Sequence, residues 1–231
     1  MAVEITWLGE SGFILSDGIT RILLDPYFSD VLGKRRADRH RMVEIKQEWL
    51  ELDYDLVLFT HCHIDHTDPE TIRMLLEKNP HLMLAGPPSS HAILEACPCY
   101  FELLEDAKVS MGAFSIRALP AIHSDRYALG YEIAHEGKRF YFSGDTALLC
   151  DLAARVPHEP DAAFLCFNAG VGKNMNANDA AVLAQRIDAK LVIPFHYGIL
   201  PGGVEPDEFA VLIREQGRAY FAPVYGETFT L

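Results

Sequence analysis

One six-residue stretch carries four strong metal-binding side chains: His61-Cys62-His63-Ile64-Asp65-His66. It follows residues 54–60, a nearly continuous apolar run that is typical of a strand buried on both faces. Side chains two residues apart on an extended chain point the same way, so we expect His61 and His63 to bind one metal ion. Asp65 and His66 would turn toward a second ion, while Cys62 points away and packs. Two divalent ions can hold a hydroxide between them, so the stretch predicts half of a two-metal hydrolytic site.

Three further residues are candidates for the other half of this site. His123, Asp145 and His196 each follow an apolar, strand-like run, and their order along the chain strengthens each assignment. Clustering three imidazoles and a carboxylate at a strand end without a metal would carry a considerable desolvation cost, which favours the metal interpretation. A lone histidine is more often a surface residue or a hydrogen-bonded core residue. We assign that role to the remaining histidines, His40, His81, His91, His135 and His158.

The composition narrows the class of protein and its partners. The chain has 231 residues, nearly half of them apolar, so it can bury a substantial core. Its formal charge of -13 would repel nucleic acid and anionic membrane surfaces, so we expect neither as a partner. The five cysteines are an odd number without a CxxC pair, which indicates reduced thiols. The chain begins with strand-like sequence and shows no targeting or membrane-spanning segment, so we expect a cytoplasmic location.

The pattern of short apolar runs and helix caps predicts mixed α and β structure. Strand-like runs cover residues 3–8, 12–16, 19–24 and 190–195, and the last of them ends at His196. Asp68-Pro69 has the acid and proline of a helix N-terminus, so we expect a helix directly behind the histidine stretch. Asn176 is expected to cap an alanine-rich helix that continues to Ile187.

Two segments in the two halves of the chain are similar. Residues 12–25 and 130–145 each contain a glycine-bounded strand, a turn and an apolar run that ends near an aspartate. This similarity predicts two related β-hairpin units in a duplicated domain, although glycine hairpins also resemble one another by chance. Two sheets flanked by helices would accommodate such a duplication. No flexible linker separates the halves, so we expect a single domain over residues 1–231.

The order of these motifs resembles the metallo-β-lactamase superfamily, over essentially the whole chain. The shared elements are the HxHxDH run, a lone histidine, an SGDT-type aspartate and a strand-end histidine. The resemblance implies an α/β fold, a four-layer αββα sandwich with two pseudo-symmetric halves. It also implies two divalent metal ions, zinc or manganese by the chemistry of the ligands, although iron would suit them as well. By this resemblance His61, His63 and His123 hold the first ion, Asp65, His66 and His196 hold the second, and Asp145 bridges both.

Asp25 has two possible roles in this arrangement. It ends the first hairpin, where it could orient a ligand histidine through a hydrogen bond. It could equally close a turn before Pro26.

Longer segments are similar to the branch typified by L-ascorbate-6-phosphate lactonase. These are residues 42–68, 170–181 and 189–197. The similarity implies hydrolysis of a lactone of a small, possibly phosphorylated sugar acid by a bridging hydroxide. A metal would stabilise the oxyanion, and Asp65 or Asp145 would act as the catalytic residue that passes a proton to the departing ring oxygen.

Candidate substrate contacts come from two polar segments and one aromatic residue. Residues 34–41 are strongly basic in an otherwise acidic chain, and they could cover an anion or simply form a solvated face or a subunit contact. A second cluster lies beside the expected helix cap, where backbone N–H groups could receive an anion, although capping alone would explain its asparagines. An aromatic residue next to His196 could border the pocket or belong to the core. The candidates are Arg35, Arg36, Arg39, Lys173, Asn174, Asn176 and Tyr197.

Two alternatives to a lactonase stay open. The same two-metal hydroxide could attack a phosphodiester, as in other relatives of the superfamily. The fold could also serve as a non-catalytic module that binds a metal or senses a ligand. For a lactonase, the expected partner is a small anionic substrate. A homo-oligomer is possible for the lactonase and for both alternatives.

Overall fold

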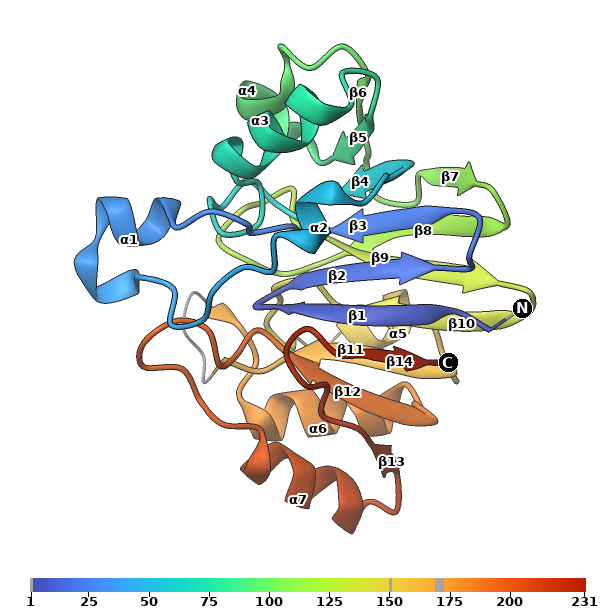
Figure 1. The fold of residues 1–231 in the computed structure, drawn as a ribbon. Coiled ribbons are helices and arrows are strands. Elements are labelled where there is room, and N and C mark those ends of the chain that lie inside the picture. Colours follow the sequence, from blue (N-terminus) through green and yellow to red (C-terminus); the bar gives the residue numbers. More distant parts are fainter. Residues whose placement is uncertain (1, 150, 169–172) are drawn as a thin grey trace. The chain divides into compact units, whose positions relative to one another are not determined.

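The computed structural model describes residues 2–149, 151–168 and 173–231 (Figure 1). The chain divides into two compact units. Unit 1 comprises Met1–Leu103, Gly198–Gly203 and Val224–Leu231, and unit 2 comprises Leu104–Tyr197 and Val204–Pro223. Cys150 and residues 170–172, which entered the sequence analysis, lie outside the described residues. A single domain over residues 1–231 stays a prediction.

Unit 1 is built on a seven-stranded mixed sheet. In spatial order its strands are β14 (Thr228–Thr230), β1 (Glu4–Gly9), β2 (Gly12–Ser16), β3 (Arg21–Leu24), β4 (Leu56–Leu58), β5 (Met83–Gly86) and β6 (Tyr100–Glu102). The strands from β14 to β3 pair antiparallel, and those from β3 to β6 pair parallel. The strands β2, β3 and β4 are almost entirely buried, in agreement with their apolar runs.

The described helices of unit 1 are short and lie in the connections between its strands. They are α1 (Val31–Arg35), η1 (Ala37–Arg39), α2 (Glu48–Glu51), α3 (Pro69–Lys78), η2 (Pro88–Ser90) and α4 (His91–Leu94). The helix α3 begins where the sequence predicts it. Asp68 accepts a hydrogen bond from the Glu70 backbone N–H, Pro69 occupies the first turn, and Ile72 and Leu75 join the apolar core that contains Val57.

Unit 2 contains a second seven-stranded mixed sheet. Its spatial order is β13 (Ala219–Tyr220), β12 (Leu191–Phe195), β11 (Ala162–Cys166), β10 (Lys138–Phe142), β9 (Leu129–His135), β8 (Phe114–Pro120) and β7 (Lys108–Met111). The described helices are α5 (Leu152–Arg155), α6 (Ala177–Arg186) and α7 (Asp207–Glu215). Within this unit α6 packs against β11 and α7, and α7 lies beside β13 (Figure 1).

The two sheets repeat one pattern of strand pairing. In unit 1 the antiparallel strands β14, β1, β2 and β3 precede the parallel strands β4, β5 and β6. In unit 2 β7, β8, β9 and β10 are antiparallel, and β11, β12 and β13 continue in parallel. The two similar sequence segments coincide with β2–β3 and β9–β10, which are equivalent in this pattern. The predicted duplication of a hairpin unit is therefore confirmed by the topology.

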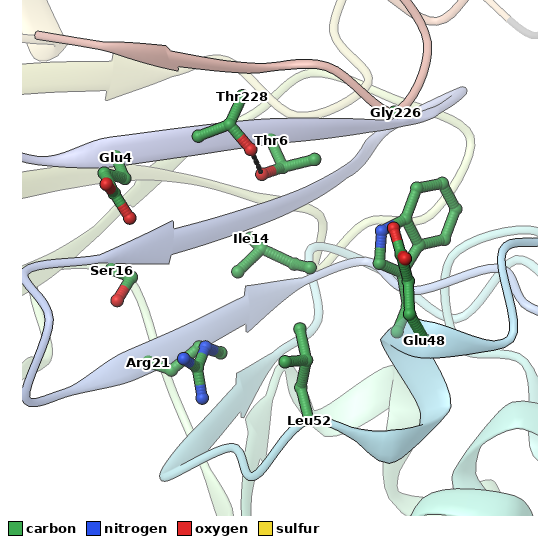
Figure 2. Close-up of a pocket in the computed structure, with 10 residues that line it drawn as sticks. Glu4, Thr6, Ile14, Ser16, Arg21, Glu48, Leu52, Gly226 and Thr228 are labelled. Atoms are coloured by element: carbon green, nitrogen blue, oxygen red, sulfur yellow. Dashed lines mark hydrogen bonds between the residues drawn. The ribbon is translucent and has the colours of Figure 1, made fainter.

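One face of the unit 1 sheet carries an open groove of about 330 Å³ (Figure 2). Residues of β1 alternate across the sheet, so Glu4 and Thr6 face the groove while Ile5 and Trp7 are buried on the other side. The hydroxyl of Thr6 lies 2.7 Å from that of Thr228 on β14 (Figure 2). None of the predicted metal ligands lines this groove. The described helices contain none that is long and apolar enough to cross a membrane.

Candidate metal centre

The histidine stretch of unit 1 lies directly after β4, at the carboxyl end of that strand. Its backbone forms turns, with the N–H groups of His66 and Thr67 both donating to the carbonyl of His63. The chain also bends at Cys62 and His63, so the extended conformation predicted there is wrong, while the predicted turn at Asp65 and His66 is present. The turn still brings Nε2 of His61 to 3.0 Å from Nδ1 of His63, and it stacks the rings of His61 and His66 with centroids 3.9 Å apart.

Asp25 contacts this cluster from the end of β3. Its Oδ2 lies 2.8 Å from Nδ1 of His66, and its Oδ1 accepts a hydrogen bond from the Thr60 backbone N–H at 2.7 Å. The Thr60 hydroxyl donates to Asp25 Oδ2 at 2.6 Å. Asp25 also adopts a positive φ of 39°, which is uncommon for a residue with a side chain. Of its two possible roles, the structure shows the one in which Asp25 orients a histidine.

These contacts select one tautomer for each buried histidine. The Thr60 hydroxyl has a single proton, which it donates in the hydrogen bond to Asp25. Its oxygen lies 3.0 Å from Nδ1 of His61, so it must accept a hydrogen bond from the Nδ1–H of that ring. His66 likewise donates a hydrogen bond from its Nδ1–H to the Asp25 carboxylate. In both rings the lone pair is then on Nε2, the nitrogen with which such a histidine binds a metal while a carboxylate or hydroxyl fixes its other nitrogen.

Unit 2 pairs Asp145 with His196. Nε2 of His196, at the end of β12, lies 3.1 Å from Oδ2 of Asp145, and both residues are more than nine-tenths buried. The same Oδ2 accepts a hydrogen bond from Nδ2 of Asn174 at 2.6 Å. Nδ1 of His196 contacts the side-chain amide of Asn168 at 3.3 Å. His196 has a φ of 68°. Residues other than glycine rarely adopt this left-handed conformation, and those that do are concentrated at functional sites.

The loop that carries Asp145 is held by hydrogen bonds of Thr146, the residue that follows it. The Thr146 N–H donates to Sγ of Cys166 at 3.4 Å, and the Thr146 hydroxyl accepts from the Ile122 N–H at 2.9 Å. The second bond ties the segment that precedes His123 to the residue that follows Asp145. Burial, together with the Asp145 carboxylate, raises the pKa of the Cys166 thiol to about 12. Cys166 is thus a neutral packing and hydrogen-bonding group at neutral pH.

Gly130 in β9 permits the close approach of this loop. A Cβ at position 130 would lie 2.8 Å from the carbonyl oxygen of Phe142 and 2.9 Å from that of Ser143, which is closer than real Cβ atoms come to other atoms. The strand can therefore pass the segment that leads to Asp145 only with glycine at this position.

The donor atoms of both units fit a metal ion. Each of the seven predicted ligands offers one imidazole nitrogen or one carboxylate oxygen. The 3.0 Å between Nε2 of His61 and Nδ1 of His63 is close to the separation of about 3.3 Å expected between two tetrahedral ligands with zinc–nitrogen bonds of about 2.0–2.1 Å. Unit 1 brings together His61, His63 and His66, with Asp65 in the same turn. Unit 2 brings together Asp145 and His196.

Several basic side chains of residues 34–41 contact other residues of unit 1. Arg36 pairs with Asp38 at 2.8 Å, Lys34 pairs with Glu70, and Arg41 donates to the carbonyl of Tyr27. The solvated-face interpretation therefore applies to Arg36. Two candidates, Arg35 and Arg39, make no ion pair with the described residues.

The remaining substrate candidates divide into surface, capping and core residues. Lys173 is exposed, while Asn176 caps α6 by accepting from the Asp179 N–H at 2.9 Å. Tyr197 is buried, donates to the Pro223 carbonyl and packs against Phe167, as the core interpretation expects. Asn174 contacts Asp145, which the sequence analysis did not anticipate.

Several residues with a role in the site escaped the sequence analysis. Thr60 precedes the predicted ligand His61, and Thr146 follows the predicted ligand Asp145. A hydroxyl residue next to a ligand was the signal in the sequence that could have identified both. Asn168 follows the buried strand β11, and polar residues directly after such strands were the signal that identified the histidines. No pattern in the sequence identifies Asp25 as a partner of Thr60 or His196 as a partner of Asn168, because these partners lie far away along the chain.

Comparisons with known proteins identify the family of the chain. Residues 20–197 match the family described as Beta-lactamase superfamily domain. A UPF0173 metal-dependent hydrolase of Oenococcus oeni is 30% identical over 227 residues, which cover 90% of this chain and 91% of the relative. The chain belongs to the UPF0173 metal-dependent hydrolases of the beta-lactamase superfamily. A second UPF0173 metal-dependent hydrolase, from Symbiobacterium thermophilum, is 29% identical and is covered over its full length, with 99% of this chain.

Two solved structures of other proteins share the fold. A metallo hydrolase from Ignicoccus hospitalis has a TM-score of 0.79 and 21% identity, with 100% of this chain and 99% of that chain covered. The metallo-beta-lactamase fold protein YhfI of Bacillus subtilis has a TM-score of 0.76 and 17% identity, with full coverage of both chains. The predicted metallo-β-lactamase fold, with mixed sheets and helices, is confirmed.

Proposed function

We propose that this metal-dependent hydrolase uses two divalent ions to open the lactone ring of a small, anionic sugar acid. The observation that carries the hydrolytic part is the fixed orientation of the unit 1 histidines, because Asp25 and Thr60 hold both buried rings with the Nε2 lone pair available. A structural histidine cluster has no need for such uniform tautomers. The lactone part rests on the resemblance to the lactonase branch. It also rests on the ability of ions held by such ligands to activate water for attack on a carbonyl carbon.

The family resemblance assigns the ligands of the two ions. His61, His63 and His123 would hold one, Asp65, His66 and His196 the other, and Asp145 both. Zinc and manganese suit these nitrogen and oxygen donors. When bound, the ions lower the pKa of a water molecule and polarise a carbonyl oxygen.

The protein side chains would position the substrate and move the proton. Opening the ring breaks the bond between the acyl carbon and the ring oxygen, which must receive a proton as it departs. Asp65 or Asp145 is the proposed carrier of that proton. Arg35, Arg39 and Lys173 are the candidate contacts for a phosphate or carboxylate, since they are cations on a chain of net charge -13.

Turnover by the metal-loaded protein tests this proposal. Metal-depleted protein is reloaded with zinc or manganese and assayed against a panel of sugar lactones and against bis-p-nitrophenyl phosphate. We expect lactone opening that is abolished in His63→Ala and retained in His81→Ala, because His81 lies on the surface. Phosphodiester hydrolysis with inert lactones would replace the proposal with a phosphodiesterase. Binding of a sugar phosphate without turnover would favour a sensing module.

A further inference from the structure

We infer that Asn174 and Asn168 are positioning residues that orient the two metal ligands of unit 2. Asn174 would hold the carboxylate of Asp145, and Asn168 would select the ring tautomer of His196. The inference rests on the metal-dependent function proposed above. It extends that function to two amide side chains that do not belong to the ligand set of the family.

The side chain of Asn174 is committed to Asp145. Asn174 is 5% exposed, and its Nδ2 donates to Oδ2 of Asp145 at 2.6 Å. The next residue, Met175, donates its backbone N–H to the carbonyl of Thr146 at 2.9 Å, so the backbone beside Asn174 is fixed to the loop of Asp145. Asn174 does not cap α6, because Asn176 occupies that position.

An amide is suited to this position because it is a neutral donor. Asp145 is 4% exposed, and a buried carboxylate needs hydrogen bonds to offset its desolvation. A lysine or arginine would supply them but would also neutralise the charge that attracts a metal cation. Asn174 binds one oxygen and leaves the negative charge of Asp145 intact. We therefore expect it to raise the metal affinity of unit 2.

Asn168 can act on His196 in two orientations. As placed, its Nδ2 faces Nδ1 of His196 at 3.3 Å, and its Oδ1 makes no hydrogen bond with the described residues. The nitrogen and oxygen of a side-chain amide exchange places by a half-turn. A histidine that binds a metal through Nε2 carries its proton on Nδ1 and requires an acceptor there. The carbonyl of Asn168 supplies that acceptor after the half-turn, and no other hydrogen bond within the described residues is lost.

Zinc affinity, measured by competition with a chromophoric chelator, tests both roles. We expect Asn174→Leu and Asn168→Leu to weaken zinc binding about tenfold or more, as loss of a group that orients a ligand typically does. Leucine has a similar volume, so packing is preserved. Asn168→Asp should retain wild-type affinity within about threefold, because a carboxylate accepts from Nδ1–H as the amide carbonyl does.

Asn176→Ala is the matched control. It removes an asparagine two residues away whose side chain caps α6, so we expect a melting temperature lower by about 2–4 °C with zinc affinity unchanged. Circular dichroism of the metal-free variants checks that each is folded. Wild-type affinity in both leucine variants would overturn the inference alone, and equal loss in Asn168→Asp and Asn168→Leu would overturn the role of Asn168. Failure of the wild-type protein to bind any divalent metal would overturn the proposed function as well.

Discussion

Oδ2 of Asp25 lies 2.8 Å from Nδ1 of His66, with both side chains almost completely buried. The two residues are 41 positions apart in the chain, and the parallel pairing of β3 and β4 brings them together. The contact gives His66 a fixed ring orientation and a fixed tautomer. A carboxylate behind a histidine also raises the basicity of the opposite nitrogen, which strengthens its bond to a metal.

Replacement of Asp25 tests this contact. Asp25→Asn keeps the shape of the side chain but removes its charge, so we expect zinc affinity to fall by about 10–100-fold. Asp53→Asn is the control, since the Asp53 side chain is 92% exposed and its charge is well solvated. Equal zinc affinities for the two variants, measured by chelator competition, would show that Asp25 has no influence on the ligands.

The Thr60 hydroxyl is predicted to contribute to both stability and metal binding. Thr60→Val preserves the shape but leaves Oδ2 of Asp25 and Nδ1 of His61 without this partner, which should lower the free energy of unfolding by about 1–3 kcal/mol. Thr60→Ser retains the hydroxyl and should recover most of the zinc affinity. Urea titration of the metal-free proteins gives the first quantity. A valine variant as stable as the wild type would contradict the prediction.

Alkaline pH is predicted to destabilise unit 2 through buried acidic groups. Burial raises the pKa of Cys166 from 9.0 to about 12 and also raises the pKa of Tyr141. Above pH 9 the unfolded chain releases the Cys166 proton while the folded chain retains it. Stability from Cys166 is therefore complete below pH 9 and declines by about 1.4 kcal/mol per pH unit until the folded pKa is reached. Urea titrations from pH 8 to pH 11 measure this slope.

Tyr141→Phe separates the tyrosine from the cysteine. The Tyr141 hydroxyl is fully buried and makes no hydrogen bond with the described residues. Its removal should leave the free energy of unfolding at pH 7 unchanged or raise it by about 1 kcal/mol. Above pH 10 the decline of stability should be shallower than in the wild type. An unchanged slope would show that Tyr141 titrates normally in the folded protein.

Thiol labelling provides a further test of burial. Of the four described cysteines, Cys166 is buried, while Cys62, Cys97 and Cys99 are partly exposed. Because the thiolate is the reactive form, we expect iodoacetamide at pH 8 to leave Cys166 unmodified in the native protein. The other three should react, with Cys97 slowed because partial burial raises its pKa. Peptide mapping after labelling in urea, where all thiols should react, supplies the control.

The strands and helices at the site were largely predictable from the sequence. The buried strand before His61, the cap at Asp68 and the cap at Asn176 all occur where local composition places them. Each depends on residues a few positions apart, and such interactions are written in the sequence. The error at His61 and His63 arose because period-two alternation was assumed beyond the end of β4, where the backbone already turns.

The sequence by itself determined the superfamily, the repeated hairpin and the residue types that can bind a metal. Only the tertiary structure decided how those residues are held: Asp25 behind His66, the Thr60 hydroxyl on Asp25, and Asn174 on Asp145. Asn174 and Asp145 are 29 positions apart, and only the folded chain brings their side chains into contact. Hydrogen bonds between distant residues leave no periodic trace in a sequence, because strand pairing and close packing bring their partners together.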